Sequence, residues 1–313
     1  MVFWSDFISQ NIHTNRFETD RSWVLLNPLE KSIKEKIEKI GLPLKDWDIK
    51  INYGIKTGFN DAFIIDGRKR KDLIIEDPRS EEIIKPLLRG RDIKRFGHEN
   101  PDLWLLYIPW HFPLHNEPSI TGASEMAEEN FKRSYPAVYN HLLKYKNELT
   151  ARNKEETGIR YEWYALQRWG SNYMDDFFKQ KIIYPNMTKF VPFFLDNSGF
   201  MQNDKSFMIV GNHLEFLVAF LNSSLFKYCF LNDFPELQGG TRELRKIFFD
   251  KIPVIRIDDK INDKFKKILD NMSDFRIKNL PTKQIEKEID NMIFDLYNLT
   301  DLECEEIGFI EIN

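Results

Sequence analysis

Cysteine is scarce in this sequence. Only Cys229 and Cys304 occur among 313 residues, and they form no CxxC pair. Structural zinc sites use closely spaced cysteine and histidine ligands, and small disulfide-stapled proteins are rich in cysteine. The sequence therefore excludes a disulfide framework and a cysteine-based zinc site, and the two thiols are expected to stay reduced inside the cell.

Long hydrophobic runs are also missing. A membrane helix needs roughly 18 uninterrupted apolar residues, and no stretch of this chain approaches that length. The start of the chain, residues 1–6, lacks the basic region and apolar run of a secretory signal. We therefore expect a soluble protein of the cytoplasm.

The chain has no strong excess of positive charge. Its formal net charge of −4 argues against indiscriminate nucleic-acid binding, which depends on a strongly basic surface. The charge is uneven, however. Residues 258–313 contain 8 Lys and Arg against 14 Asp and Glu, a net of −6, so residues 1–257 carry +2. A polyanion is expected to bind the earlier part.

Motifs for nucleotide and metal chemistry are absent or fit poorly. No strand-like run leads into a GxGxxG loop. The run at residues 54–58, GIKTG, contains a Lys-Thr pair, but its glycine spacing is typical of a hairpin turn and not of a phosphate-binding loop. Pro113 separates His111 from His115, so the histidines are not expected to share a helix face as metal ligands. We predict no catalytic residue, cofactor site or metal site in this chain.

The apolar periodicity predicts an α+β fold: a mainly antiparallel β-sheet domain with packed helices and a C-terminal helical appendage. Three consecutive parts are expected. Residues 1–45 form an N-terminal connector with an amphipathic helix, residues 46–257 form the main domain, and residues 258–313 form the helical tail.

Individual elements follow from local patterns. Helices are expected over residues 29–40, 136–149, 214–230 and 285–296, with a short helix between Pro78 and Pro86 and a capping box from Thr300 to Glu303. A β-hairpin is expected over residues 49–65, and further strands over 103–108, 181–184, 191–195 and 206–210, the last three as an antiparallel meander. Residues 231–241 are predicted to form a loop.

Several segments resemble, in order, the TaqI-like C-terminal specificity domain of type IIG restriction enzymes and adenine-specific DNA methyltransferases. INYGIKTGFNDAFIID at residues 51–66 resembles the opening of that domain. The segments that follow are IKPLLRGRDI at 84–93, LWL at 103–105, YPA at 135–137, WYALQR at 163–168 and KIIYP at 181–185. EIDNMIFDLYNLT at 288–300 resembles the closing helix of such enzymes.

The resemblance implies that residues 46–257 form a DNA target-recognition domain for sequence-specific reading of double-stranded DNA. In the family this domain works with an N6-adenine methyltransferase domain that binds S-adenosylmethionine, and it directs methylation and, in fusions with a nuclease, cleavage. That catalytic domain carries a Pro-Pro motif and would precede residue 1, whereas no Pro-Pro pair occurs here. We therefore expect an excised fragment or a separately encoded specificity piece, with double-stranded DNA and a methyltransferase domain or subunit as partners.

Two basic clusters are candidates for contacts with DNA phosphates. One is the run RKRK at residues 68–71, and the other comprises Lys85, Arg89, Arg91, Lys94 and Arg95. Alternatives remain for both clusters. The run RKRK is typical of a polar loop, and Arg89 or Arg91 could instead pair with Asp92 or lock the following turn.

The segment RYEWYALQR at residues 160–168 is the candidate for base readout. Arginine and glutamine can bind guanine and adenine edges bidentately, and aromatic rings can lie against sugars or bases. The alternative is that Trp163, Tyr164 and Trp169 belong to the core, with Arg168 as their cap. The complete set of predicted DNA-binding residues is Lys56, Arg68, Arg70, Arg89, Arg91, Arg95, Arg160, Tyr161, Trp163, Gln167, Arg168, Lys189, Gln238 and Arg242.

A second class of function stays open, a protein-interaction module that docks a partner through its acidic helical tail. The salt dependence of binding distinguishes the two hypotheses. Affinity that depends on phosphate contacts falls steeply as ionic strength rises, whereas affinity from apolar docking does not.

Overall fold

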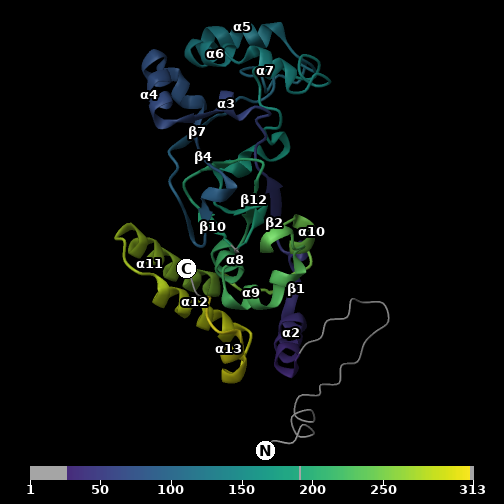
Figure 1. The fold of residues 1–313 in the computed structure, drawn as a ribbon, viewed down its shortest axis with the longest axis vertical. Helices are drawn as coiled ribbons and strands as arrows, with labels where there is room; N and C mark the ends of the chain where they lie inside the picture. The colour runs from purple at the N-terminus through teal and green to yellow at the C-terminus, as the bar shows by residue number, and fades with distance from the viewer. Residues whose placement is uncertain (1–26, 190–191, 311–313) are drawn as a thin grey trace, which may run out of the picture. The chain divides into compact units, whose positions relative to one another are not determined.

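The computed structural model describes residues 27–189 and 192–310, which form an α+β fold, as predicted (Figure 1). The chain divides into two compact units. Among the described residues, the helical unit comprises 27–47, 223–233 and 247–310, and the sheet unit comprises 48–189, 192–222 and 234–246. Residues 1–26 of the predicted connector lie outside the described part.

The first sheet of the sheet unit has the strand order β10-β8-β12-β2 and is antiparallel throughout. Its strands are β2 (Ile49–Tyr53), β8 (Lys181–Pro185), β10 (Phe194–Asp196) and β12 (Ser206–Gly211). The three predicted strands between residues 181 and 210 are therefore confirmed as antiparallel, although Val191 lies outside the described residues. They do not form a meander, because β8 lies between β10 and β12.

The second sheet has the order β11-β4-β7-β3. Its strands are β3 (Ile64–Asp66), β4 (Ile84–Leu88), β7 (Leu103–Leu106) and β11 (Met201–Gln202). Pro86 was predicted to end the short helix that begins at Pro78. It lies instead inside β4 opposite Trp104, and the 3₁₀ helix η2 (Pro78–Ile83) ends before it. The parallel pair β11 and β4 is the one exception among the described strand pairs of this otherwise antiparallel sheet.

The predicted hairpin over residues 49–65 is wrong. Strand β2 pairs with β12, strand β3 pairs with β7, and residues between them form the short helix α3 (Asn60–Phe63). Alternating apolar residues predict a strand but not its partner. The partner is chosen by which sheet buries the apolar face, and Ile51 and Ile65 are buried in different sheets.

Helices cover the sheet unit. They are α4 (Gly67–Glu76), α5 (Glu125–Ser134), α6 (Pro136–Leu143), α7 (Lys146–Ala151) and α8 (Leu214–Leu221), and Figure 1 shows α5, α6 and α7 gathered together. The single helix predicted from Pro136 is interrupted, because the Lys144 and Tyr145 amides donate to carbonyls three residues back, which ends the α-helical pattern. The single helix predicted over 214–230 is also two helices. Ser223 caps the second, α9 (Ser224–Phe230), by accepting from the Phe226 amide.

Short elements complete the sheet unit. They are the 3₁₀ helices η3 (Gly90–Asp92), η4 (Ser171–Phe178) and η6 (Gln238–Gly240), and the strand pairs β5 (Ile93–Lys94) with β6 (Gly97–His98) and β9 (Met187–Thr188) with β13 (Arg242–Glu243). The main core of this unit runs from Ile55 to Met208 in sequence and is rich in aromatic side chains. It packs the second sheet against α5 and α6 through residues such as Leu105, Phe131 and Val138.

The helical unit is built from α2 (Pro28–Ile40), α9, α11 (Asp259–Ile277), α12 (Lys283–Leu296) and α13 (Asp301–Ile307). It also contains the 3₁₀ helices η1 (Leu44–Asp46) and η5 (Leu231–Asp233) and the antiparallel strand pair β1 (Gly41–Pro43) and β14 (Pro253–Ile255). The short helix α10 (Lys246–Phe249) begins at the last residue of the sheet unit and continues into the helical unit. The predicted helix over residues 29–40 and the capping box at Thr300–Glu303 are both confirmed.

Two buried carboxylates join the helices of this unit. Asp290 of α12 accepts hydrogen bonds from the amide and hydroxyl of Ser224 (2.9 and 2.6 Å). Glu303 of α13 contacts Lys36 Nζ (2.6 Å) and accepts from the Ser32 hydroxyl, both on α2. Long-range polar contacts of this kind hold helices that are distant in sequence.

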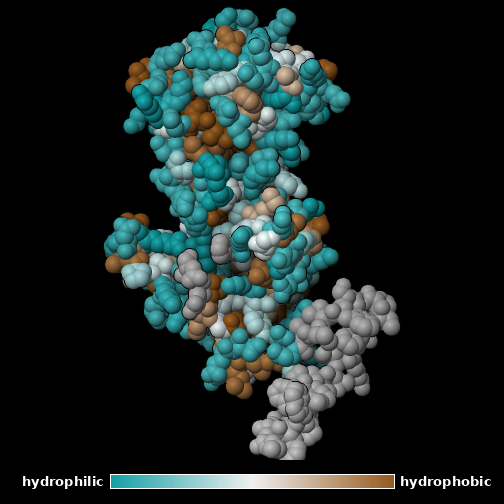
Figure 2. Space-filling view, in the orientation of Figure 1, coloured by the Kyte–Doolittle hydropathy of each residue, from teal (hydrophilic) through white to brown (hydrophobic). Residues whose placement is uncertain are grey.

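The face seen in Figure 2 is mostly hydrophilic, with hydrophobic side chains in small patches. In the described part of the chain, no single helix has the length and hydropathy to cross a membrane, although the bent pair Leu214–Leu221 and Ser224–Asp233 meets those criteria together.

Candidate nucleic-acid interface

The structure brings two of the predicted DNA-binding segments side by side. The Lys56 amide donates to the Arg168 carbonyl, and the Arg168 amide donates to the Lys56 carbonyl, both at 2.9 Å. The side chain of Lys56 is half-buried and that of Arg168 is exposed. Two cations that are far apart in the sequence are thus held at facing backbone positions of the sheet unit.

The loop that carries Lys56 is fixed by close backbone packing. The Gly54 amide donates to the Ser206 carbonyl (3.0 Å), and the Ile55 amide donates to the Gln202 carbonyl (2.8 Å). A Cβ atom on Gly54 would lie 1.9 Å from the Asn203 carbonyl oxygen, so no other residue fits there. Gly54, which the sequence assigned to a hairpin turn, therefore permits the close approach of the backbone at residues 202–203.

Polar and aromatic side chains adjoin Lys56 and Arg168. Gln167 is half-buried and contributes a carboxamide. The hydroxyl of Tyr173 interacts electrostatically with Arg168 and with Tyr53, whose side chain is 51% exposed. Burial raises the pKa of Tyr173, although Arg168 partly opposes this, so Tyr173 stays a neutral hydrogen-bond donor at neutral pH. This group, Lys56, Gln167, Arg168, Tyr173 and Tyr53, is called the Lys56–Arg168 surface below.

Two aromatic residues predicted to contact DNA are core residues instead. Tyr161 is 0% exposed and stacks on Trp110, with ring centroids 4.7 Å apart. Trp163 is 7% exposed and donates its indole N–H to Glu128 (2.8 Å). Both rings are thus packed inside the sheet unit. Aromatic residues suit cores and interfaces equally, so their type alone does not decide between the two.

Arg160, by contrast, is exposed at the end of this segment. Its guanidinium lies 5.4 Å from the Trp110 ring centroid and 3.4 Å from a Glu156 carboxylate oxygen. Ion pairs as exposed as this one contribute little stability. Arg160 therefore stays a candidate for contact with DNA.

A buried glutamate anchors the predicted readout segment, and sequence analysis missed it. Glu162 is 3% exposed and accepts hydrogen bonds from the His111 amide (2.7 Å), His111 Nδ1 (3.0 Å) and the Ser124 amide (3.0 Å). The signal for its burial in the sequence is the position of Glu162 between two aromatic residues, Tyr161 and Trp163, which are themselves buried. His111 thus has an anchoring partner, and among the described residues no group of three or more metal-ligating side chains is found.

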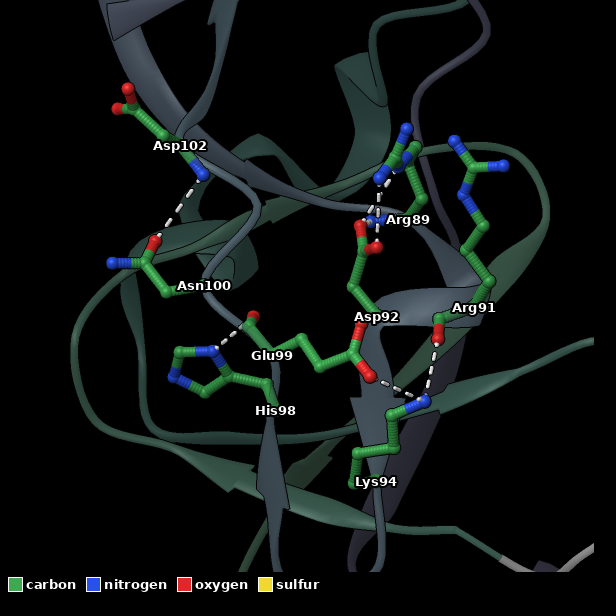
Figure 3. Close-up of polar contacts among 8 residues, drawn as sticks. All are labelled: Arg89, Arg91, Asp92, Lys94, His98, Glu99, Asn100 and Asp102. Carbon is green, nitrogen blue, oxygen red and sulfur yellow. Dashed lines mark hydrogen bonds and ion pairs between the residues drawn. The ribbon is translucent and has the colours of Figure 1, made fainter.

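In the basic segment from Lys85 to Arg95, the side chains of Arg89 and Lys94 are occupied by structural contacts (Figure 3). Arg89 Nε and Nη2 donate to the two carboxylate oxygens of Asp92, both at 2.9 Å, and the Arg89 amide donates to the same carboxylate at 2.8 Å. The hydrogen bonds that Arg89 donates to the Asp92 carboxylate raise the pKa of Arg89. The sequence left open that Arg89 pairs with Asp92 instead of contacting a phosphate, and in the structure Arg89 forms this salt bridge.

The other cations of this segment differ from one another. Arg91 is exposed, and its carbonyl oxygen accepts from Lys94 Nζ (3.2 Å). Lys94 Nζ also lies 3.1 Å from a Glu99 carboxylate oxygen. Arg95 Nε donates to the Asn222 carbonyl (2.8 Å). Among Arg89, Arg91, Lys94 and Arg95, Arg91 is therefore the cation best placed to meet a phosphate.

The run RKRK at residues 68–71 lies at the start of α4, which begins at Gly67, and not in a loop. The side chain of Asp66 caps this helix by accepting from the Lys69 amide (2.7 Å). Arg68 is exposed, whereas Arg70 contacts Glu81 (2.8 Å) and lies 4.1 Å from the Trp104 ring centroid. Cations in the first turn oppose the helix dipole, so this placement carries a local electrostatic cost that a bound anion would relieve.

The remaining predicted residues lie on or near the strand pair β9 and β13. Lys189, which follows β9, and Gln238, in η6, are exposed. Arg242 pairs with Glu236 (2.8 Å) and donates to the Phe234 carbonyl (3.1 Å). Its contacts hold the turn that presents Gln238.

Comparison with known proteins gives the family context for this surface. The profile of the TaqI-like C-terminal specificity domain matches residues 85–254. The chain is 24% identical over 259 residues to the type II methyltransferase M.MjaIV of Methanocaldococcus jannaschii, a match that covers 80% of this chain and 79% of the relative.

Two solved restriction-modification structures are also similar. The type IIL restriction-modification enzyme MmeI, solved in complex with DNA, matches with a TM-score of 0.55 at 14% identity over 85% of this chain and 34% of that chain. The type IIG restriction endonuclease BpuSI matches with a TM-score of 0.48 at 14% identity over 87% of this chain and 34% of that chain. The chain spans about a third of the length of these two enzymes. By its profile match, this chain belongs to the family of TaqI-like C-terminal specificity domains.

Proposed function

We propose that this chain is the sequence-recognition module of a restriction-modification N6-adenine DNA methyltransferase, and that it binds double-stranded DNA. The observation that carries the proposal is the backbone pairing of Lys56 with Arg168, because it assembles a basic, polar and aromatic surface from segments distant in sequence. Membership of the specificity-domain family supports the same conclusion.

Within this function we assign two kinds of contact. Gln167 and Arg168 are the proposed base readers, because a carboxamide can bind an adenine edge and a guanidinium a guanine edge with two hydrogen bonds each. Arg68 and Arg91 are exposed cations proposed to contact phosphates, which position the protein without reading sequence. Arg160, Lys189 and Gln238 are further candidates because each is exposed.

The methyl donor belongs to the partner in this proposal. S-adenosylmethionine would be bound by a companion methyltransferase domain or subunit, while this chain holds and orients the duplex in the cytoplasm. Calorimetric titration of the purified chain with S-adenosylmethionine is expected to give no binding heat. Micromolar binding would contradict this division of roles.

The deciding experiment compares reader and phosphate variants in an enzyme assembled with its methyltransferase domain, after its recognition sequence has been determined. Q167A and R168A are each expected to cost about 1 to 3 kcal/mol on the cognate duplex and little on mixed-sequence DNA. R91A is expected to weaken binding to all sequences similarly. Melting temperatures serve as the control for folding, since Arg168 is exposed and its loss should scarcely change stability.

The outcomes separate the competing functions. If R91A changes sequence preference and R168A does not, the two assignments are reversed. If the chain binds duplex DNA without salt dependence, or not at all, DNA recognition is contradicted and partner docking through the acidic tail becomes the better hypothesis. The isolated chain is expected to bind duplex DNA weakly, near the non-specific range of about 10⁻⁴ to 10⁻⁶ M, because the companion domain supplies part of the grip.

A further inference from the structure

Arg152 is a half-buried arginine that links the two halves of the Lys56–Arg168 surface. It follows the last residue of α7, and its backbone amide donates to the Glu148 carbonyl (3.0 Å). Its guanidinium donates through Nη1 to the Thr57 carbonyl and through Nη2 to the carbonyls of Trp163 (3.1 Å) and Ala165. One side chain thus binds three main-chain oxygens that belong to two separate segments.

These three carbonyls adjoin the proposed DNA-contacting residues. Thr57 is the neighbour of Lys56, and Ala165 is two residues before Gln167. The same loop is held close to Arg152, since a Cβ atom on Gly58, whose φ is +78°, would lie 2.7 Å from Arg152 Cδ. The guanidinium therefore fixes the loop of Lys56 against the segment of Gln167 and Arg168.

Two aromatic rings lie near this half-buried guanidinium. Its carbon Cζ lies 5.4 Å from the Phe63 ring centroid and 5.6 Å from that of Tyr161. Within residues 27–189 and 192–310, no carboxylate forms a salt bridge with it. Burial lowers the pKa of Arg152 to about 10, so it remains charged at neutral pH. Buried charges usually have a partner of opposite sign, because an unpaired one opposes folding.

Only the arginine side chain suits this set of acceptors. Its planar guanidinium offers five N–H donors in a fixed fork, whereas lysine offers a single nitrogen on a flexible stem. Hydrogen bonds from a charged donor are roughly twice as strong as neutral ones, which offsets part of the cost of burial. The guanidinium therefore aligns two segments of the chain, at a cost to the stability of the fold.

We propose that Arg152 is the positioning residue of the Lys56–Arg168 surface, and that it sets the register of Lys56 against Gln167 and Arg168 without touching DNA. This inference rests on the proposed function of that surface. Arg152 acts through the carbonyls of Thr57, Trp163 and Ala165, so its loss should displace both segments together.

The first test measures positioning without DNA, by amide hydrogen exchange on the full chain. R152M is expected to speed exchange at residues 54–58 and 163–168 at least tenfold, including the paired amides of Lys56 and Arg168. R152K is expected to restore only part of the protection. The control is L149A, which removes a fully buried side chain from the same helix and should lower the melting temperature without selectively exposing those two segments.

The results decide the proposal clearly. Exchange in R152M equal to that of the wild type at both segments would overturn it, and so would full protection in R152K, because the fork would then be unnecessary. If R152M does not fold, R152K supplies the comparison with the wild type. This arm does not depend on whether the chain binds DNA.

The second test uses a fluorescein-labelled duplex of mixed sequence and follows binding as salt is varied. Each lost phosphate contact lowers the slope of log affinity against log salt by about 0.9. R152M should therefore weaken binding and lower the slope by about as much as K56M does, because Lys56 is the cation of this surface that is left for a phosphate contact when Arg168 reads a base. Added to K56M, R152M should cause no further loss. A further loss would show that Arg152 contacts DNA itself and would overturn its role as a positioning residue.

Failure of the proposed function gives a different pattern. If the wild-type chain shows no salt-dependent DNA binding while R152M still speeds exchange at both segments, Arg152 positions the surface but the surface is not a DNA site. If wild-type binding is salt-dependent and R152M changes neither exchange nor slope, the positioning role alone is lost.

Discussion

Replacement of Arg89 by alanine is expected to destabilise the sheet unit and to leave DNA binding largely unchanged. Arg89 and Asp92 form a two-pronged salt bridge with both distances at 2.9 Å. The side chain of Asp92 is 3% exposed and that of Arg89 is 28% exposed. After R89A the buried carboxylate keeps the Arg89 backbone amide as a donor but loses both guanidinium contacts.

The expected cost follows from these contacts. Breaking a fully buried ion pair costs about 3 to 5 kcal/mol, and leaving a buried polar group unsatisfied costs about 1 to 3 kcal/mol. Because Arg89 is partly exposed, water can reach the carboxylate after truncation, so we expect a loss near 2 kcal/mol. In a unit of this size that corresponds to a fall in melting temperature of about 4 to 8 °C.

The effect should depend on pH. Burial acts to raise the pKa of Asp92, but the hydrogen bonds from Arg89 outweigh it, so the pKa lies below its ordinary value. The salt bridge therefore stabilises the fold above the unfolded pKa, about 3.9, and this stability is lost as pH falls through the lower folded value. The difference between wild type and R89A is expected to shrink below about pH 4.

The assay is thermal unfolding followed by circular dichroism between pH 3 and pH 7, with R91A as the matched control. Arg91 is exposed two residues away, so R91A should leave the melting temperature within about 1 °C of the wild type. An R89A variant with unchanged stability and a flattened salt dependence of DNA binding would refute the reasoning, because Arg89 would then serve as a phosphate contact.

Three further predictions concern other contacts. R91A should flatten the salt dependence of duplex binding by about 0.9 in slope, measured by fluorescence anisotropy; an unchanged slope would remove Arg91 from the interface. K181M should cost about 3 to 5 kcal/mol in urea unfolding, because Lys181 Nζ lies 2.6 Å from Asp196 and both side chains are 0% exposed; a loss below about 1 kcal/mol would contradict this. Burial acts to raise the pKa of Glu303, but hydrogen bonds from Lys36, Thr300 and Ser32 lower it to about 2. Its contacts thus stabilise the fold above the unfolded value of 4.5 and are lost as pH falls towards 2, so E303Q should cost about 2 to 3 kcal/mol at pH 7 and progressively less below pH 4.5 in calorimetric unfolding. An equal cost at pH 3 and pH 7 would count against it.

Local features of the fold could be predicted from the sequence because their causes lie within a few residues. Helix α2 begins at Pro28 after the Asn27 cap and buries Ile33 and Ile37, as its apolar spacing predicts. The capping box at Thr300 and Glu303 depends on two side chains three residues apart. The family resemblance also rested on short runs of consecutive residues, and the profile match confirmed it.

The composition of the candidate site could be predicted only in part. Arg91, Arg160 and Arg168 are exposed, consistent with the predicted roles, whereas Tyr161 and Trp163 are buried and Arg89 is paired with Asp92. An arginine or a tyrosine has the same chemistry in a core as at an interface. Its exposure depends on which distant segments pack against it, and that information is not local.

The sequence by itself determined the fold class, the positions of most helices and strands, and the family. Only the tertiary structure decided that β2 pairs with β12, that Lys56 faces Arg168, and that Arg152 donates hydrogen bonds to both of their segments. The physical reason is that strand partners and buried hydrogen bonds are selected by the combined burial of residues far apart in the chain, whereas helix caps and apolar periods depend on neighbours.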